Sequence, residues 1–175
     1  MRRRLLVGLA VVVLAAVAYV FLVRGRSVAP RFVPVEPTSA IGSGSSAVGV
    51  SAEGAVLTWL PPPKESSLPR LPLSEPPKSG HLDGRALQQA RVLGAAPAAL
   101  RPYLKSSHYG ESGVDVELAS GVELRFGDAS EAAKKWRAAA AVLADPSVTA
   151  LDYVDLHAPG RPAIRGSGHT LPPIR

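Results

Sequence analysis

The sequence predicts an α+β fold, namely a small, mainly antiparallel sheet with two helices packed on one face, preceded by a single N-terminal transmembrane helix. Three observations support this prediction. An uninterrupted apolar segment stands near the N-terminus. Short segments that alternate apolar and polar residues surround glycine-containing turns. Two further segments repeat apolar residues at the 3.6-residue spacing of a helix.

The first 26 residues contain the apolar segment. Residues 1–4 form a basic tail, and the 19 residues from Leu5 to Val23 carry no charge. A helix of that length is about 28 Å long at ~1.5 Å per residue, close to the ~30 Å hydrocarbon core of a bilayer. Because a backbone in hydrocarbon must satisfy its own hydrogen bonds, residues 5–23 are predicted to form a transmembrane helix.

A cleaved signal peptide is the alternative interpretation of this segment. Ala16-Val17-Ala18 has the small residues of a cleavage site. The apolar run continues beyond it to Val23, which favours a retained anchor. Arginines flank both ends of the run, so the positive-inside rule gives no clear orientation. The very short N-terminal tail favours an inside N-terminus and an extracytoplasmic domain.

The charge distribution argues against a nucleic-acid partner. The formal net charge of +6 comes from the two ends, because residues 36–155 hold all 14 acidic side chains and 11 basic ones. The basic residues near the N-terminus are better explained as anchors at lipid headgroups. No dense basic patch is interleaved with aromatic residues, so no nucleic-acid binding is predicted.

No catalytic or metal-binding pattern is present. Cysteine is absent, which excludes disulfides and thiolate metal sites. The four histidines lack the spacing of metal ligands, and no nucleophile motif or phosphate-binding loop has the required context. The sequence therefore predicts no enzymatic activity, no cofactor and no small-molecule substrate.

Proline and glycine indicate the domain boundaries. Residues 24–46 contain spaced prolines and then a Gly/Ser run, and are predicted to be a linker. The domain is expected over residues 47–166, followed by a loose basic tail over 167–175. Within it, Val48–Val50 and Ala55–Leu60 predict a first hairpin with Gly54 at positive φ.

In the middle of the domain, prolines and helix-capping residues indicate the bounds of the elements. A proline-rich surface loop is expected over residues 61–80. Asp83 is the expected N-cap of a helix that ends near Gly94. A short helical turn is expected within 97–104, and residues 106–112 are expected to be a loop.

The strongest local signal is a second hairpin followed by a helix. Residues 114–118 and 122–126 alternate apolar and charged side chains around Gly121. Asp128 and Glu131 have the spacing of a capping box at the start of a helix that Asp145-Pro146 ends. On this helix Trp136 is the expected largest core residue, and the face expected in water consists of Lys134, Lys135 and Arg137.

The C-terminal part predicts two more strands. Residues 148–156 alternate, and a turn leads into a short final strand over 161–166. Pro162 belongs at a sheet edge because it lacks a main-chain donor. Arg125 is expected to pair with Glu117 or Asp115 across the solvent-facing side of the sheet. The predicted core consists of Val114, Val116, Leu118, Leu124, Phe126, Trp136, Leu143 and Leu151.

The order of these signals resembles a known family. An N-terminal anchor, then "GVSAEGAVL", a proline-rich loop, a helix, then "GVDVELASGVELRFGDASEAAKKWRAAAAVL" and "YVDLHAPGRPAI" are similar to the C-terminal β-domain of the bacterial cell-division protein FtsQ, called DivIB in some bacteria. The resemblance covers roughly residues 48–166. Members of this family carry a POTRA domain after the anchor, and the short segment before Val48 leaves no room for one.

The resemblance implies a non-enzymatic scaffold in the inner membrane at the division septum. It implies that the extracytoplasmic domain recruits an FtsB–FtsL pair, through strand addition to the edge of the last strand, and helps regulate septal peptidoglycan synthesis. Such an edge offers unpaired main-chain groups. The partner-binding residues carried over in this way are His157, Ala158, Gly160, Arg161, Ala163, Ile164 and Arg165.

Other interpretations remain open from the residues alone. Pro162 and Arg161 could serve only to protect a free edge from aggregation. A different envelope adaptor, such as a secretion or transport component, has the same plan of anchor, linker and small domain. A secreted protein with a cleaved signal would have a mature N-terminus near Tyr19.

Overall fold

The computed structural model describes residues 35–64 and 68–171. The predicted transmembrane helix at 5–23 lies outside the described residues. None of the helices within the described ranges is long and apolar enough to cross a bilayer. Residues from Val35 onward form one compact unit.

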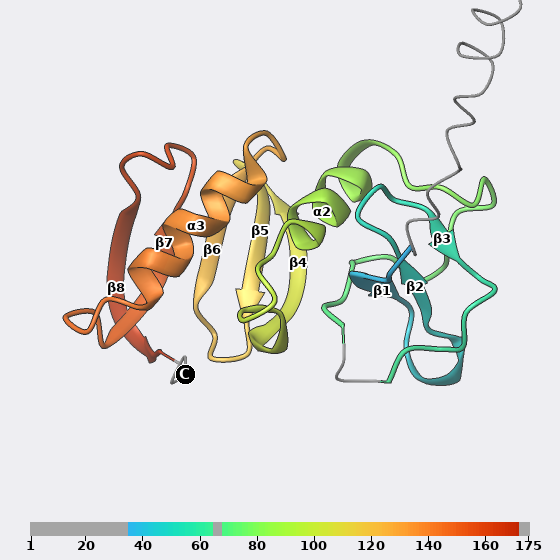
Figure 1. Cartoon of the computed structure of the whole chain (residues 1–175), viewed down its shortest axis with the longest axis horizontal. Coiled ribbons are helices and arrows are strands. Elements are labelled where there is room, and N and C mark those ends of the chain that lie inside the picture. The colour runs from blue at the N-terminus through green and yellow to red at the C-terminus, as the bar shows by residue number, and fades with distance from the viewer. Residues whose placement is uncertain (1–34, 65–67, 172–175) are drawn as a thin grey trace, which may run out of the picture. The chain divides into compact units, whose positions relative to one another are not determined.

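The domain is α+β, with a mainly antiparallel sheet and two α-helices, as predicted. Five strands lie in the order β4-β5-β6-β7-β8, and only the β6–β7 pair is parallel. Figure 1 shows α2 and α3 on the same face of these strands. The elements of this part are α2 (Gly84–Gly94), η2 (Arg101–Tyr103), β4 (Leu104–Gly110), β5 (Gly113–Leu118), β6 (Glu123–Gly127), α3 (Ala132–Leu143), β7 (Ala150–Asp155) and β8 (Ala163–Thr170).

A smaller antiparallel sheet precedes these elements. Its strands are β1 (Ser39–Ile41), β2 (Val48–Val50) and β3 (Val56–Leu57), with the 3₁₀ turn η1 (Gly44–Ser46) between the first two. The predicted hairpin is present, with Gly54 at φ +87°, but its second strand is shorter than the predicted 55–60 and covers only Val56–Leu57. The folded part begins earlier than expected, because β1 lies inside the segment interpreted as linker. Its three residues are fully buried, which the surrounding prolines and glycines concealed.

Arg70 joins the two sheets. It forms parallel bridges to Ala40 of β1 and to Ser106 of β4. Four main-chain hydrogen bonds of 2.9–3.0 Å surround it, two toward β1 and two toward β4. Arg70, a residue of the proline-rich loop, therefore continues the main-chain hydrogen bonding from one sheet to the other.

The core lies between the helices and the sheet. Every predicted core residue is buried, with Phe126 and Trp136 the two largest fully buried side chains. Their ring centroids are 4.7 Å apart, a favourable aromatic contact. The Trp136 indole N–H donates to the Val92 carbonyl of α2 at 2.7 Å, so the tryptophan ties the two helices together.

Two predicted loops are strands instead. Of the predicted loop 106–112, residues 106–110 belong to β4 and 111–112 form the turn into β5; Ser107 is buried and its hydroxyl donates to the Gln89 side chain at 2.9 Å. The tail expected to be loose from residue 167 continues β8 to Thr170. Both segments are polar, and their pairing is set by neighbouring strands rather than by hydrophobic alternation.

Candidate functional site

β8 is the open edge of the five-stranded sheet. It is hydrogen-bonded to β7 alone, and all eight of its residues are exposed. Figure 1 shows it beside β7, beyond the strands that α3 crosses. The opposite end of the sheet system differs, because β3 is bordered by a bridge between Ala55 and His81. Within the described ranges, β8 has no neighbour on its outer side, whereas β4, the other edge of the five-stranded sheet, is bridged to Arg70 at Ser106.

The direction of its main-chain groups follows from the neighbouring ladder. The Leu156 N–H donates to the Arg125 carbonyl of β6 at 2.8 Å. Because main-chain groups alternate along a strand, those of Tyr153 and Asp155 face β8. Their register partners are Arg165 and Ala163, so these two residues bond to β7.

The alternate residues of β8 face outward. Ile164 directs both its N–H and its C=O to the open edge, because it lies between Ala163 and Arg165. Pro162 lies two residues before Ile164 and faces the same way, so the N–H that proline lacks is not one that would bond to β7. The exposed edge therefore offers a donor and an acceptor at Ile164 and an acceptor at Pro162.

The side chains of this edge differ on its two faces. Ile164 lies opposite Val154, on the helix-bearing face, and is 49% exposed. Arg165 lies opposite Tyr153, on the other face. Neither Arg165 nor Arg161 forms an ion pair with the part of the chain that the structure describes. The open edge of β8 is thus flanked by the apolar side chain of Ile164 and by the positive charges of Arg161 and Arg165.

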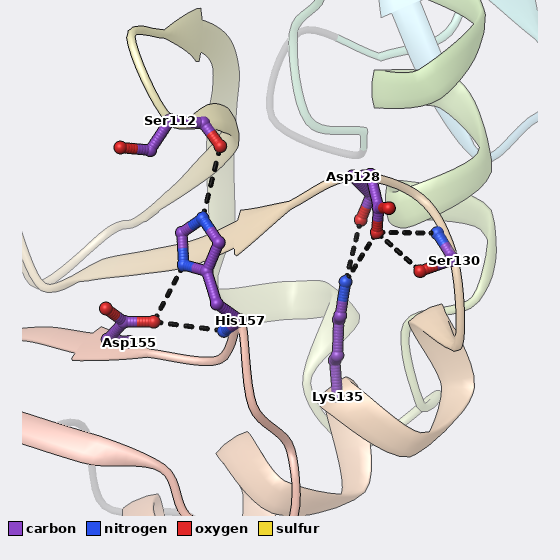
Figure 2. A network of polar contacts seen from close by, with 6 residues as sticks. All are labelled: Ser112, Asp128, Ser130, Lys135, Asp155 and His157. Carbon is purple, nitrogen blue, oxygen red and sulfur yellow. Dashed lines mark hydrogen bonds and ion pairs between the residues drawn. The ribbon is translucent and has the colours of Figure 1, made fainter.

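His157 fixes the loop that leads into β8 (Figure 2). Its Nδ1 lies 2.8 Å from Asp155 Oδ1, and its Nε2 lies 3.1 Å from the Ser112 carbonyl. The ring also covers Gly127, where an added Cβ would approach its Cδ2 to 2.6 Å. The side chain therefore joins the β4–β5 turn, the end of β6 and the β7–β8 loop.

The protonated imidazole suits both contacts of His157. A carbonyl only accepts hydrogen bonds, and so does a carboxylate, whereas a neutral imidazole has one N–H. The hydrogen bonds to Asp155 and Ser112 raise the pKa of His157 above 6.5. Burial alone would raise the pKa of Asp155, but the hydrogen bonds from the main chain and ring of His157 lower it.

A second polar junction fixes the start of α3 (Figure 2). Lys135, only 3% exposed, places its Nζ 2.8 Å from Asp128 Oδ1 and 3.1 Å from the Asp128 carbonyl. Bonds from Lys135 and Ser130 lower the pKa of Asp128 to about 2. The predictions of a capping box and of a solvent-exposed Lys135 were therefore wrong. The helix begins at Ala132 after Glu131, which has φ +50°, and Asp128 binds the lysine instead of capping.

The helix-free face of the sheet carries a charged cluster. Arg125 binds Glu123 at 2.5 Å and stacks 3.7 Å from the Tyr153 ring centroid. Asp115 is the cross-strand register partner of Arg125, as one of the two predicted alternatives had it, but the ion pair of Arg125 is with Glu123. Asp115 is 7% exposed and lies 3.5 Å from His108. Burial and the neighbouring Glu123 raise its pKa.

All seven predicted partner residues lie in the β7–β8 loop and in β8. His157, Ala158, Gly160 and Arg161 belong to the loop, and Ala163, Ile164 and Arg165 to the strand. Sequence reasoning missed the contacts of His157, because they depend on Ser112 and Gly127 from distant elements. Among the described residues, no group of three or more His, Cys, Asp or Glu could hold a metal ion.

Comparison with known families agrees with the sequence resemblance. The family model for "Cell division protein FtsQ/DivIB, C-terminal" matches residues 42–157. The match ends at His157, near the start of the β7–β8 loop, so the rest of the loop and β8 lie beyond it. No curated protein matches the chain at a significant level.

Proposed function

The chain belongs to the FtsQ/DivIB family of cell division proteins, and we propose that it is a membrane-anchored division scaffold that binds a protein partner along the open edge of β8. The proposal rests on one observation. An eight-residue strand at the edge of the sheet is exposed on both faces and is paired on one side only. Unpaired N–H and C=O groups of this kind are a template for strand addition.

The partner class follows from the edge and from the family. An added segment must be extended, with an apolar side chain beside Ile164 and an acidic one beside Arg165. FtsB–FtsL-like division proteins are the partners that the family resemblance implies. Residues 5–23 would anchor the chain as a single-pass protein with an inside N-terminus. The domain would then act outside the inner membrane at the septum, where it helps regulate peptidoglycan synthesis.

The available edge is short. The main-chain groups at Ile164 and Pro162 allow only about three hydrogen bonds, each contributing about 1 kcal/mol. Side-chain contacts and co-localisation in the same membrane must supply the remaining affinity. Tethering two proteins to one surface raises their effective concentration, so a weak contact can be sufficient.

The test is a pull-down of envelope proteins with the full-length chain in detergent. Ile164→Pro removes the outward donor without removing a bond to β7, and Ile164→Asp places a negative charge in the apolar position. The matched control is Val35→Asp, because Val35 is a similarly exposed apolar residue (54%) far from β8 in the sequence.

We expect the wild type and the Val35 variant to capture FtsB–FtsL-like coiled-coil proteins, and both Ile164 variants to lose at least tenfold of the capture. Circular dichroism must show that all variants are folded. Equal capture by wild type and Ile164 variants would place the contact elsewhere. Capture of no division protein by the wild type would refute the scaffold function.

A further inference from the structure

The edge strand is interrupted in its middle by an irregularity opposite Asp152. Leu151 pairs with His169 and Tyr153 pairs with Arg165, so one residue of β7 faces three residues of β8. The three residues that face Asp152 are Gly166, Ser167 and Gly168. A bulge of this kind locally disrupts a ladder and bends the strand that carries it.

One carboxylate occupies the bulge. Asp152 Oδ1 accepts a hydrogen bond from the Gly168 N–H at 2.8 Å. Gly166 has φ +85°, and a Cβ at this position would overlap the carboxylate of Asp152. A Cβ at Gly168 would approach Oδ1 to 2.5 Å. Both glycines therefore leave room for the same side chain.

The Asp152 carboxylate also accepts a hydrogen bond from the Gly168 N–H, which forms no main-chain hydrogen bond in the β7–β8 ladder. The Leu171 N–H donates to the Thr149 carbonyl at 3.2 Å, so β8 returns to regular pairing with β7 beyond the bulge. Without Asp152, the Gly168 N–H would lose its partner. The strand would then be free to straighten into a longer flat edge, the form that favours pairing between copies.

From these contacts we propose that Asp152 is a positioning residue that holds the bulge, confines the docking edge to residues 162–165, and prevents β8 of one copy from pairing with β8 of another. The docking role of the edge rests on the proposed function. The effect on pairing between copies does not, because it concerns this chain alone.

The test uses the full-length chain in detergent without any partner. Asp152→Ala removes the carboxylate, whereas Asp152→Asn keeps the Oδ1 acceptor and removes the charge. Gly168→Ala is a second way to displace the carboxylate, should the alanine variant at 152 fail to fold. Asp145→Ala is the matched control, because Asp145 is also an exposed carboxylate that accepts a main-chain N–H, from Ser147 at 2.9 Å.

Two quantities are measured, hydrogen–deuterium exchange of the Gly168 amide and self-association by sedimentation velocity. For Asp152→Ala and Gly168→Ala we expect exchange at least tenfold faster than in the wild type. We also expect self-association at least tenfold tighter, and its loss on addition of Ile164→Pro. Asp152→Asn and Asp145→Ala should match the wild type in both measurements.

Unchanged exchange in Asp152→Ala and Gly168→Ala would overturn the proposal, because Asp152 would then not hold the bulge. Faster exchange without tighter self-association would also overturn it, because the bulge would then not limit the edge. Neither outcome depends on capture of a division protein. The result is therefore separate from that of the pull-down.

Discussion

β1 and β8 are both short of large apolar residues, yet they have opposite environments. All three residues of β1 are buried, and β1 has a main-chain neighbour on each side, β2 and Arg70. All eight residues of β8 are exposed, and it has one neighbour. The comparison teaches that the neighbours of a strand, more than its composition, decide whether it stabilises the domain or remains available for binding.

Trp136→Ala is expected to have the largest effect, since Trp136 belongs to the core that includes Ile41 of β1 and no residue of β8. The residue is fully buried, packs on Phe126 and donates to Val92, so its truncation leaves a cavity and an unpaired carbonyl. We expect a loss of about 3–5 kcal/mol in the free energy of unfolding. Chemical denaturation followed by circular dichroism measures it, and an unchanged transition would contradict the core described above.

The direct test of the comparison is the same substitution in the two strands. Ile41→Ala should lower the free energy of unfolding by about 2–5 kcal/mol, because Ile41 is fully buried. Ile164→Ala should change it by less than about 0.5 kcal/mol, because half of that side chain is already in water. Equal losses in the two denaturation curves would remove the distinction between the strands.

Gly127→Ala tests whether β8 is held through its loop. Gly127 has φ +71° and lies under the His157 ring. The positive φ and the overlying ring both make a Cβ at this position unfavourable, so we expect Gly127→Ala to lower the free energy of unfolding by about 1–3 kcal/mol. In a His157→Ala background the steric part should disappear, so the loss there should be smaller. An identical loss in both backgrounds would show that the ring does not restrain this loop.

The smallest expected effect depends on pH. The pKa of His157 is raised in the folded state, so the folded state binds this proton more tightly than the unfolded state. This contribution is complete below pH 6.5 and is lost as the pH rises through the folded pKa. Denaturation midpoints between pH 5 and 9 should fall for the wild type. A similar fall in His157→Gln would assign the effect to another group.

Asp128 should act in the opposite direction at acid pH. Its pKa of about 2 lies below the ordinary 3.8, so its contribution is present above pH 3.8 and is lost as the pH falls through 2. Asp128→Asn should therefore reduce the acid sensitivity of unfolding between these values, measured by circular dichroism. The same acid sensitivity in both proteins would exclude this group as its source.

The sequence was informative where the signal is local. Alternation around Gly121 predicted the β5–β6 hairpin, because one face of that hairpin is buried and the other is not. The spacing of apolar residues predicted α3 and the burial of Trp136 for the same reason. The breaker Asp145-Pro146 marked the helix end correctly, since the helix ends at Leu143.

Contacts between distant residues were the part that local patterns could not predict. β4 is polar and is held by β5 and by Gln89, so its sequence looked like a loop. Asp128 had the spacing of a helix cap, but its carboxylate binds Lys135, seven residues further along the chain. The predicted site residues form one loop and strand, whereas Asp152 and Ser112, which hold its geometry, have no signal in their own surroundings.

The bridge at Arg70 has a mechanical consequence. β1 lies near the start of the described domain and β8 near its end, and the sheet between them is continuous only through Arg70. Tension transmitted through the sheet between a membrane tether before β1 and a partner on β8 would cross four main-chain hydrogen bonds at that residue. The link between the two sheets along the main chain thus depends on a single residue, whereas the apolar core that they share holds them together independently of it.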